Sequence, residues 1–124
     1  YYTSYNIIRK EVFIPMDAQM KRGLLEACVL SLLLKGDSYG YLLIQEVSAL
    51  MPISESTLYP VLRRLEAAGH LTVYSREHNG RLRKYYQITE NGKMQIQAFL
   101  KEWEDVNRVY AFIQSATTKE ETHE

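Results

Sequence analysis

Residues 54–88 of this 124-residue chain combine the pattern of a helix with the pattern of a β-hairpin. In the first part, apolar residues follow the spacing i, i+3, i+4 and i+7, which is typical of a helix with one buried face. These residues are Leu58, Val61, Leu62 and Leu65. Ser54 or Ser56 can cap the start, and Gly69 suits the left-handed conformation that often ends a helix. Pro60 is expected near the first turn, where a proline costs least.

The second part of this segment predicts two antiparallel strands. Residues 71–76 alternate between the two faces of a strand, and the alternation resumes from Leu82 to Ile88. Between the two runs stands the pair Asn79-Gly80, the strongest short-range hairpin signal, because both residues tolerate a positive φ. The chain should therefore pass from the helix directly into a tight hairpin.

The exposed side of the predicted helix carries groups that suit the major groove of DNA. Short hydroxyl side chains and a tyrosine near a helix N-terminus can meet base edges, and arginines further along can meet phosphate or guanine. An ordinary amphipathic surface helix would show much of the same pattern. The candidate DNA contacts on this helix are Ser56, Thr57, Tyr59, Arg63 and Arg64.

The predicted hairpin has a basic tip. Arg81, Arg83 and Lys84 follow the turn with no acidic residue among them. An isolated basic turn is usually a solvated loop. Attached directly to a candidate recognition helix, it is better interpreted as a contact to phosphate or to the minor groove.

The formal net charge of zero hides an uneven distribution of charge. Residues 54–86 carry six basic and three acidic residues, a net charge of +3, whereas residues 87–124 carry four basic and seven acidic residues, a net charge of −3. Such sorting is expected when one surface meets a polyanion and the other does not.

The overall composition predicts one small intracellular domain. With 46% apolar residues, the chain can form a modest core that dimerisation would strengthen. No apolar run reaches the length of a membrane span and no signal peptide is recognisable, so we expect no membrane contact and a cytoplasmic location. The single cysteine, Cys28, falls on an apolar helical face and is expected to be a packing residue.

Two further helices precede the segment described above, over residues 17–35 and from Tyr39 or Tyr41 to Met51. The second has an apolar set of Leu42, Leu43, Val47 and Leu50. The predicted fold class is therefore mainly α with a β-hairpin wing: a winged helix-turn-helix over residues 16–89, followed by a C-terminal dimerisation helix over 90–114 and a flexible tail over 115–124.

Residues 1–15 are expected to be a leader without a functional role. Arg9-Lys10-Glu11-Val12 can be encoded by a ribosome-binding sequence, which would make Met16 the initiator.

The C-terminal helix, which Thr89 can cap, carries a narrow stripe of large apolar residues spaced alternately by three and four. It could pack on the first helix of its own subunit, but a broader face would then be expected, so we favour a homodimer. A two-fold dimer predicts a palindromic operator with half-sites roughly 10 bp apart. The dimerisation residues are Ile96, Phe99, Trp103, Val106, Tyr110 and Ile113.

Five motifs together resemble the PadR family of bacterial transcriptional regulators, in its short subgroup with a single C-terminal helix. They are DAQMKRGLL at 17–25, SYGY at 38–41, TLYPVLRRLE at 57–66, GRLRKYY at 80–86 and TENG at 89–92. The resemblance implies a homodimeric transcriptional repressor that binds double-stranded DNA. Its affinity for the operator would be tuned by a small molecule or an environmental signal. The DNA-facing residues that the resemblance implies are Tyr39, Ser56, Thr57, Tyr59, Arg63, Arg81, Arg83 and Lys84. Lys21 and Arg22 could add phosphate contacts or be solvated charges.

The resemblance also raises the question of a ligand at Trp103, the only tryptophan. In drug-binding members of the family, a tryptophan at this place stacks on flat aromatic molecules between the subunits. Trp103 could instead simply fill the dimer core. The neighbours implied for a small aromatic effector are Ala27, Ser31, Ile96, Leu100 and Asn107.

Two other classes of function are a protein-binding module and an enzyme. A winged helix can act as a protein-protein interaction module without specific DNA binding, its basic wing meeting an acidic partner. An enzyme is disfavoured, since the three histidines have no pairing with Cys28 or with clustered carboxylates, and the sequence has no metal-ligand spacing and no glycine-rich phosphate loop. We therefore expect no catalytic residue, metal or cofactor.

Overall fold

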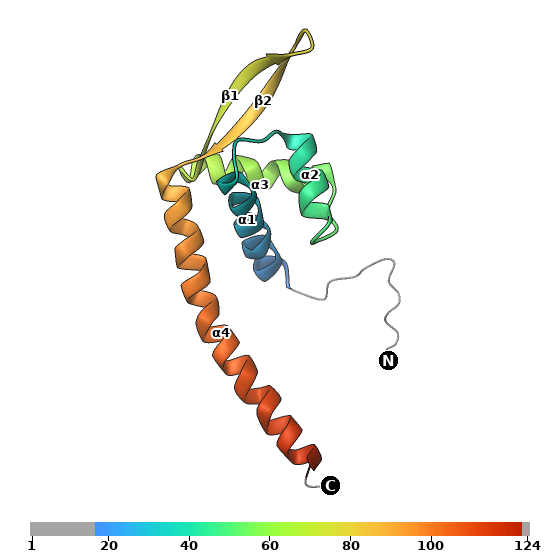
Figure 1. Ribbon diagram of the computed structural model, residues 1–124, viewed down its shortest axis with the longest axis vertical. Coiled ribbons are helices and arrows are strands. Elements are labelled where there is room, and N and C mark those ends of the chain that lie inside the picture. The colour runs from blue at the N-terminus through green and yellow to red at the C-terminus, as the bar shows by residue number, and fades with distance from the viewer. Residues whose placement is uncertain (1–16, 123–124) are drawn as a thin grey trace.

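The computed structural model describes residues 17–122 and has the predicted element order of three helices, a hairpin and a last helix (Figure 1). The elements are α1 (Ala18–Leu34), α2 (Gly40–Ser48), α3 (Glu55–Ala67), β1 (Leu71–His78), β2 (Arg81–Ile88) and α4 (Glu90–Thr122). The predicted leader and initiator Met16 lie outside the described residues. This arrangement confirms the predicted winged helix-turn-helix, in which the β1–β2 hairpin is the wing.

The core lies between α1, α2 and α3 and extends to the base of the wing. Each helix contributes leucines and valines that are almost completely buried, and the wing adds Leu71 and Tyr86. Cys28 packs against this cluster and is partly buried, which agrees with the packing role that the sequence predicted. Leu50, in contrast, was wrongly predicted to belong to the apolar face of the second helix. It is 66% exposed, because α2 ends at Ser48 and Met51 takes the buried place instead.

Helix α3 begins earlier than expected relative to Pro60. Pro60 lies inside the helix, in its second turn rather than its first, so it cannot donate a backbone hydrogen bond to the carbonyl of Ser56. Burial of Leu58 and Val61 on either side of Pro60 offsets this loss. Ser54 occupies the N-cap position, but its hydroxyl lies 2.8 Å from the Ser56 hydroxyl and bonds no backbone N–H.

The end of α3 and the turn of the wing follow the sequence prediction. Gly69 has a φ of 80°, and the N–H of His70 donates to the carbonyl of Leu65 at 2.9 Å, which satisfies the last turn of α3. In the wing turn, Asn79 and Gly80 have φ angles of 53° and 80°. Positive φ at both central residues defines a type I′ turn, whose twist matches the twist of the two strands.

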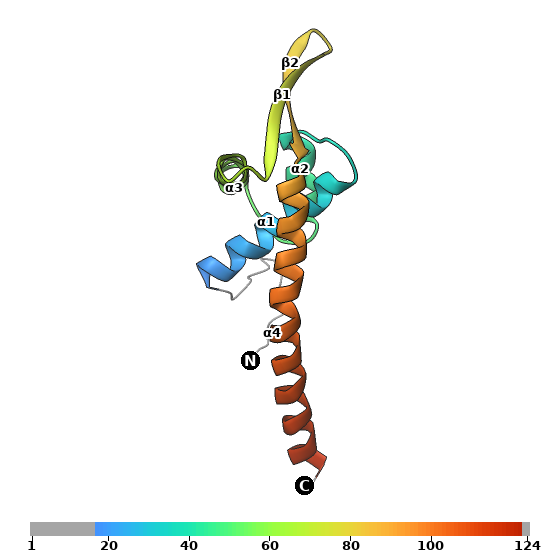
Figure 2. The ribbon, with the colours of Figure 1, turned by 90° about the vertical axis from the view of Figure 1, so that its left-hand side faces the viewer.

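The strand register gives the wing two different faces. Val73 pairs with Tyr86, and Leu71 with Ile88, on the face that joins the core. Arg76 pairs with Arg83, and Tyr74 with Tyr85, on the other face. Leu82 continues the core-facing alternation but is 78% exposed, because the outer half of the hairpin projects beyond the helices (Figures 1 and 2).

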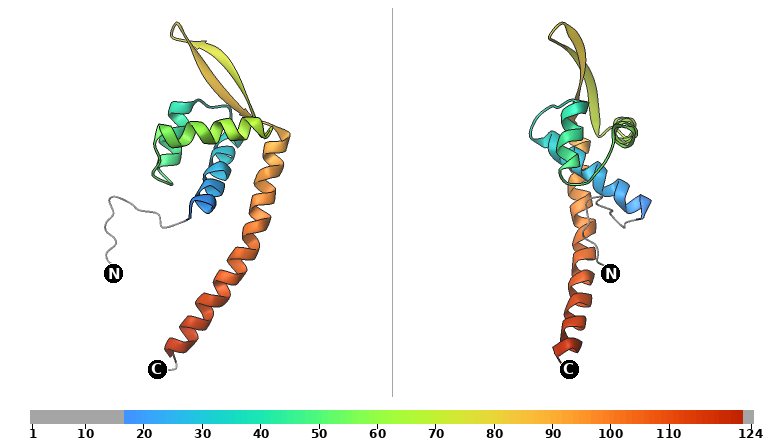
Figure 3. Two further views of the ribbon diagram at one scale, coloured as in Figure 1. Left: turned by 180° about the vertical axis from the view of Figure 1, so that it is seen from behind. Right: turned by 90° about the vertical axis from the view of Figure 1, so that its right-hand side faces the viewer.

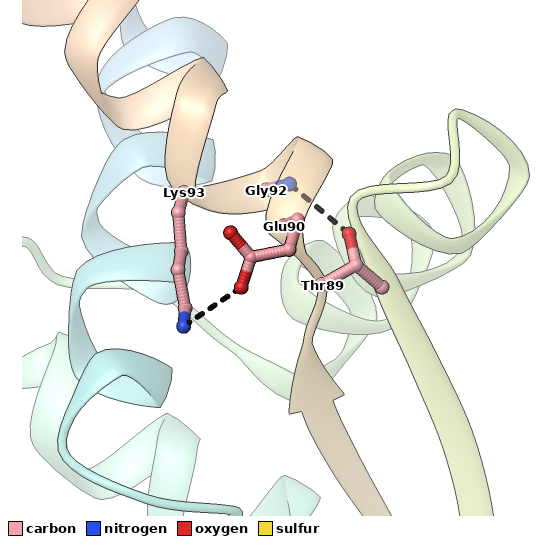
Figure 4. A network of polar contacts seen from close by, with 4 residues as sticks. All are labelled: Thr89, Glu90, Gly92 and Lys93. Carbon is pink, nitrogen blue, oxygen red and sulfur yellow. Dashed lines mark hydrogen bonds and ion pairs between the residues drawn. The ribbon is translucent and has the colours of Figure 1, made fainter.

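Thr89 connects the wing to α4 and caps the helix as predicted. Its Oγ1 accepts a hydrogen bond from the N–H of Gly92 at 3.0 Å and donates one to the carbonyl of Gly69 at 2.7 Å. In the first turn of α4, Lys93 pairs with Glu90 at 3.2 Å (Figure 4). A β-carbon on residue 92 would overlap the carbonyl oxygen of His70, so a glycine is needed for α4 to start this close to the wing.

Helix α4 is longer than the sequence predicted. We expected it to end at residue 114 and a flexible tail to follow, but the helix continues to Thr122. In this extension the hydroxyls of Thr117 and Thr118 donate to the carbonyls of Ile113 and Gln114, so the polar side chains are accommodated within the helix. The first half of α4 packs along α1, while the second half extends well beyond the other elements (Figures 1 and 3).

Candidate nucleic-acid interface

The polar side of α3 is exposed, as a recognition helix requires. Ser56, Thr57, Tyr59 and Arg63 are all exposed, opposite the buried leucines of the same helix. Tyr59 also has a packing role: a β-carbon on Gly40 would overlap its hydroxyl oxygen, and two of its ring carbons lie 3.0 Å from that position. The start of α2 therefore packs directly on Tyr59.

Arg64 differs from the other candidates on α3. Its Nε donates to Glu26 Oε2 of α1 at 3.1 Å, and both side chains are partly buried. The sequence grouped Arg64 with the DNA contacts, whereas the structure gives it a carboxylate partner within its own chain. The pairing joins residues 38 positions apart, so no local pattern could reveal it.

Arg83 and Tyr39, two other candidates, lie together where the wing meets α2. The Cζ atom of Arg83 is 3.6 Å from the centroid of the Tyr39 ring, a cation–π contact. The same guanidinium donates from Nε to the hydroxyl of Tyr85 at 3.0 Å. Of the remaining wing candidates, Arg81 is at the turn and exposed, and Lys84 is exposed on the opposite face of the wing from Arg83.

The structure adds residues that the sequence reasoning missed on this face of the wing. Tyr74 stacks on Tyr85 with 5.6 Å between ring centroids, and Arg76 lies 5.0 Å from the centroid of the Tyr85 ring. Tyr74 donates its hydroxyl to Asp37 Oδ2 at 2.6 Å. The alternation of the hairpin could have identified this set, because residues directly opposite each other across an Asn-Gly turn share a face.

Hydrogen bonds fix the wing to the start of α2. The backbone N–H of Ser38 donates to the carbonyl of Tyr86 at 3.1 Å, and the N–H of Tyr86 donates to the carbonyl of Ser38 at 2.7 Å. Ser38 thus extends the two-stranded sheet by one residue pair. The wing is thus joined to the start of α2 through Ser38, and the start of α2 is in turn packed on Tyr59 of α3.

Two tyrosines of the wing, Tyr74 and Tyr86, have raised pKa values. The hydrogen bond to Asp37 is the main cause that raises the pKa of Tyr74, with desolvation adding to it. Burial raises the pKa of Tyr86, and Tyr59 and Glu66 act in the same direction while Arg63 opposes them. Both phenols therefore stay protonated at neutral pH.

A groove of about 540 Å³ lies between α1 and the first half of α4. Trp103 lines it together with Phe99, whose ring centroid is 5.7 Å away, and Ala27 lies on the opposite wall. Of the other neighbours that the resemblance implied for an effector, Ser31, Leu100 and Asn107 are exposed side chains that do not line this groove, and Ile96 is buried in the core.

The predicted dimerisation residues divide into two groups along α4. Ile96 is only 6% exposed and belongs to the core of its own chain, because α4 packs on α1 at this level. Val106, Tyr110 and Ile113 are exposed, as are Val109 and Phe112, which the sequence prediction did not include. The stripe thus serves the chain's own core at its start and is uncovered in its second half.

Residues 17–122 contain neither a membrane-spanning helix nor a metal-binding cluster. No helix of this part of the chain is both long and apolar enough to cross a membrane. Nor do three or more His, Cys, Asp or Glu side chains gather there in an arrangement that could hold a metal ion.

A winged helix-turn-helix with an exposed recognition helix and a basic wing defines a class of DNA-binding proteins. The sequence model of the transcriptional regulator PadR-like family matches residues 29–98. The chain belongs to this family, as the resemblance of its motifs predicted, and is a DNA-binding transcription regulator.

Individual relatives agree with this assignment. The uncharacterized protein X of Lysinibacillus sphaericus is 39% identical over an alignment of 93 residues, and the match covers 71% of this chain and 85% of that protein. A solved structure from Streptococcus mutans, smu.1704, has a TM-score of 0.72 and 38% identity, and the match covers 84% of this chain and 94% of that one. A PadR family transcription regulator from Clostridium difficile has a TM-score of 0.67 and 28% identity, with coverage of 73% and 97%.

Proposed function

We propose that this protein is a cytoplasmic, homodimeric repressor that binds a palindromic operator and is relieved by a small-molecule or environmental signal. It would belong to the short subgroup of its family, with a single C-terminal helix. Each subunit would place α3 in the major groove, where Ser56, Thr57 and Arg63 meet base edges and phosphates. The wing would contact the neighbouring backbone through Arg81, Arg83 and Lys84.

The observation that carries the proposal is the division of α4. Its second half exposes Val106, Val109, Tyr110, Phe112 and Ile113, a large apolar surface on a single helix. Such a surface is unfavourable in water and is typical of an interface. A second copy of α4 is the partner that fits this surface best. The exposed residues recur every three or four positions, which is the spacing found where two helices pack against each other. Two-fold symmetry would then present two recognition helices, hence the palindrome.

DNA binding is tested by a gel-shift assay with the DNA immediately upstream of the protein's own gene, in a salt series and with unrelated competitor DNA. We expect specific retardation that weakens as salt rises, because phosphate contacts release counterions. Arg63→Ala should weaken it. Arg108→Ala is the matched control: it also removes one exposed positive charge, but from α4, beside Asp105. Absence of retardation by the native protein at low salt would favour the protein-protein interaction module instead.

The effector is proposed to bind where Trp103 and Phe99 line the groove between α1 and α4. Aromatic walls suit a flat aromatic molecule. Since Trp103 is the only tryptophan, its fluorescence reports on this groove directly. We expect a planar aromatic compound to quench this fluorescence and to reduce DNA retardation over the same concentration range. Quenching without any change in DNA binding would show that the groove holds a ligand but does not regulate.

A further inference from the structure

Arg76 and Arg83 lie directly opposite each other across the wing. Like charges in this position repel and destabilise a hairpin. Among the residues whose side chains the structure describes, neither guanidinium forms an ion pair with a carboxylate. The nearby carboxylate of Asp37 accepts the hydroxyl of Tyr74 instead. Two adjacent positive charges are therefore kept without an acidic partner in this part of the chain.

Three tyrosines hold these two arginines, and we call Tyr39, Tyr74 and Tyr85 the tyrosine frame. Tyr85 is at its centre: Tyr74 stacks on it, and Tyr39 meets it edge-on with ring centroids 5.8 Å apart. The Cζ atoms of Arg76 and Arg83 lie 5.0 Å and 5.1 Å from the centroid of the Tyr85 ring. The frame provides cation–π attraction to both charges and limits their motion.

The frame leaves both guanidinium groups able to bind an anion. Arg83 donates from Nε and Nη2 to the single hydroxyl oxygen of Tyr85, and Arg76 donates from Nη2 to the hydroxyl of Tyr74. A guanidinium carries five N–H donors, so each arginine retains donors beyond these bonds. Such planar, fixed donors match phosphate as well as carboxylate, and phosphate is the anion that DNA presents.

We propose that Arg76 and Arg83 form a phosphate-binding pair of the DNA interface and that the tyrosine frame positions them. The proposal rests on the DNA-binding function and adds two assignments to it. Arg76 becomes a DNA contact. Tyr39 acts as a positioning residue, through Arg83, rather than as the direct DNA contact that the family resemblance implies.

The first test is a double-mutant comparison of DNA affinity. Tyr39→Leu removes the ring under Arg83, whereas Tyr39→Phe keeps the ring and removes only the hydroxyl. We expect Tyr39→Leu and Arg83→Ala each to weaken operator binding by about tenfold, and Tyr39→Leu to cause no further loss when Arg83 is already alanine. Tyr39→Phe should bind like the native protein.

Salt dependence tests the assignment of Arg76. Arg76→Ala and Arg83→Ala should each reduce the slope of log affinity against log salt by about 1, as the loss of one phosphate contact predicts. Arg108→Ala on α4 should leave the slope unchanged. The proposal is overturned if Tyr39→Phe weakens binding as much as Tyr39→Leu, if the losses in the double variant add, or if Arg76→Ala leaves the slope unchanged.

A second measurement separates this proposal from DNA binding itself. In the free protein, the NMR signal of the Arg83 Nε–H should be shifted by the ring current of Tyr39, and Tyr39→Leu but not Tyr39→Phe should abolish the shift. Inorganic phosphate at constant ionic strength should move the Arg76 and Arg83 signals and leave the Arg108 signal in place. If the native protein binds no DNA but shows this response, the DNA-binding function fails and the phosphate pair stands. If phosphate moves neither signal, the phosphate pair is wrong.

Discussion

The ring of Tyr59 on α3 occupies the space that a β-carbon on Gly40 of α2 would need. This contact places the start of α2 directly against a side chain of α3. We predict that Gly40→Ala lowers the free energy of unfolding by about 1–3 kcal/mol, because the added methyl displaces Tyr59. Urea denaturation measures the change.

Gly23→Ala is the control for this prediction. Gly23 is also a helical glycine, but nothing lies within 4 Å of its missing β-carbon. Alanine there should stabilise the protein by about 1 kcal/mol through its better helix propensity. If both substitutions stabilise, the contact between Gly40 and Tyr59 does not limit the packing of α2 on α3.

Neighbouring arginines of α3 should differ in their effects. Arg63→Ala should reduce specific DNA affinity, by about 1–3 kcal/mol if the contact is to a base edge. Arg64→Ala should leave DNA affinity nearly unchanged and lower the free energy of unfolding by about 0.2–1 kcal/mol, the usual value of a partly exposed ion pair. Gel-shift titrations and urea denaturation of both variants measure the two effects. Equal losses of DNA affinity would mean that Arg64 leaves Glu26 when DNA binds.

Charge placed on the uncovered part of α4 should separate the subunits. We expect Tyr110→Glu and Ile113→Glu to give monomers in sedimentation velocity experiments, because an unpaired carboxylate is costly at an apolar interface. Ser115→Glu adds the same charge on the side of the helix away from these residues and should remain dimeric. A native protein that sediments as a monomer would refute the dimer outright.

The hydroxyl of Thr89, which links the wing to α4, should contribute to the free energy of unfolding. Thr89→Ala removes the N-cap of α4 and the bond to Gly69, and should cost about 0.5–2 kcal/mol in the free energy of unfolding. Thr89→Ser keeps the hydroxyl and should lie close to the native value. Thermal unfolding followed by circular dichroism distinguishes the two. A serine variant as unstable as the alanine variant would assign the effect to the lost methyl group instead.

The elements that the sequence predicted well are those with a local physical signal. The leucine spacing of α3, the Asn79-Gly80 turn and the cap at Thr89 each depend on residues close together in the chain. Pro60 was misplaced because burial of Leu58 and Val61 favours an earlier helix start than the proline alone suggests.

The features that escaped prediction depend on contacts between distant segments. Glu26 lies 38 residues before its partner Arg64, and Tyr39 reaches Arg83 only after the chain has folded. Similarly, the apolar stripe of α4 looks continuous in the sequence. Only the position of α1 shows that Ile96 is covered while Tyr110 is not.

One residue, Thr89, separates the last residue of the wing from the first residue of α4. At 1.5 Å per residue, the helix is a rod about 50 Å long that starts at the base of the wing. A rod of this length acts as a lever: a tilt of about 5° displaces its far end by roughly 4 Å relative to its base. Because only Thr89 joins the wing to this helix, a small change of the angle between the two copies of α4 in the proposed dimer would change the spacing of its two wings.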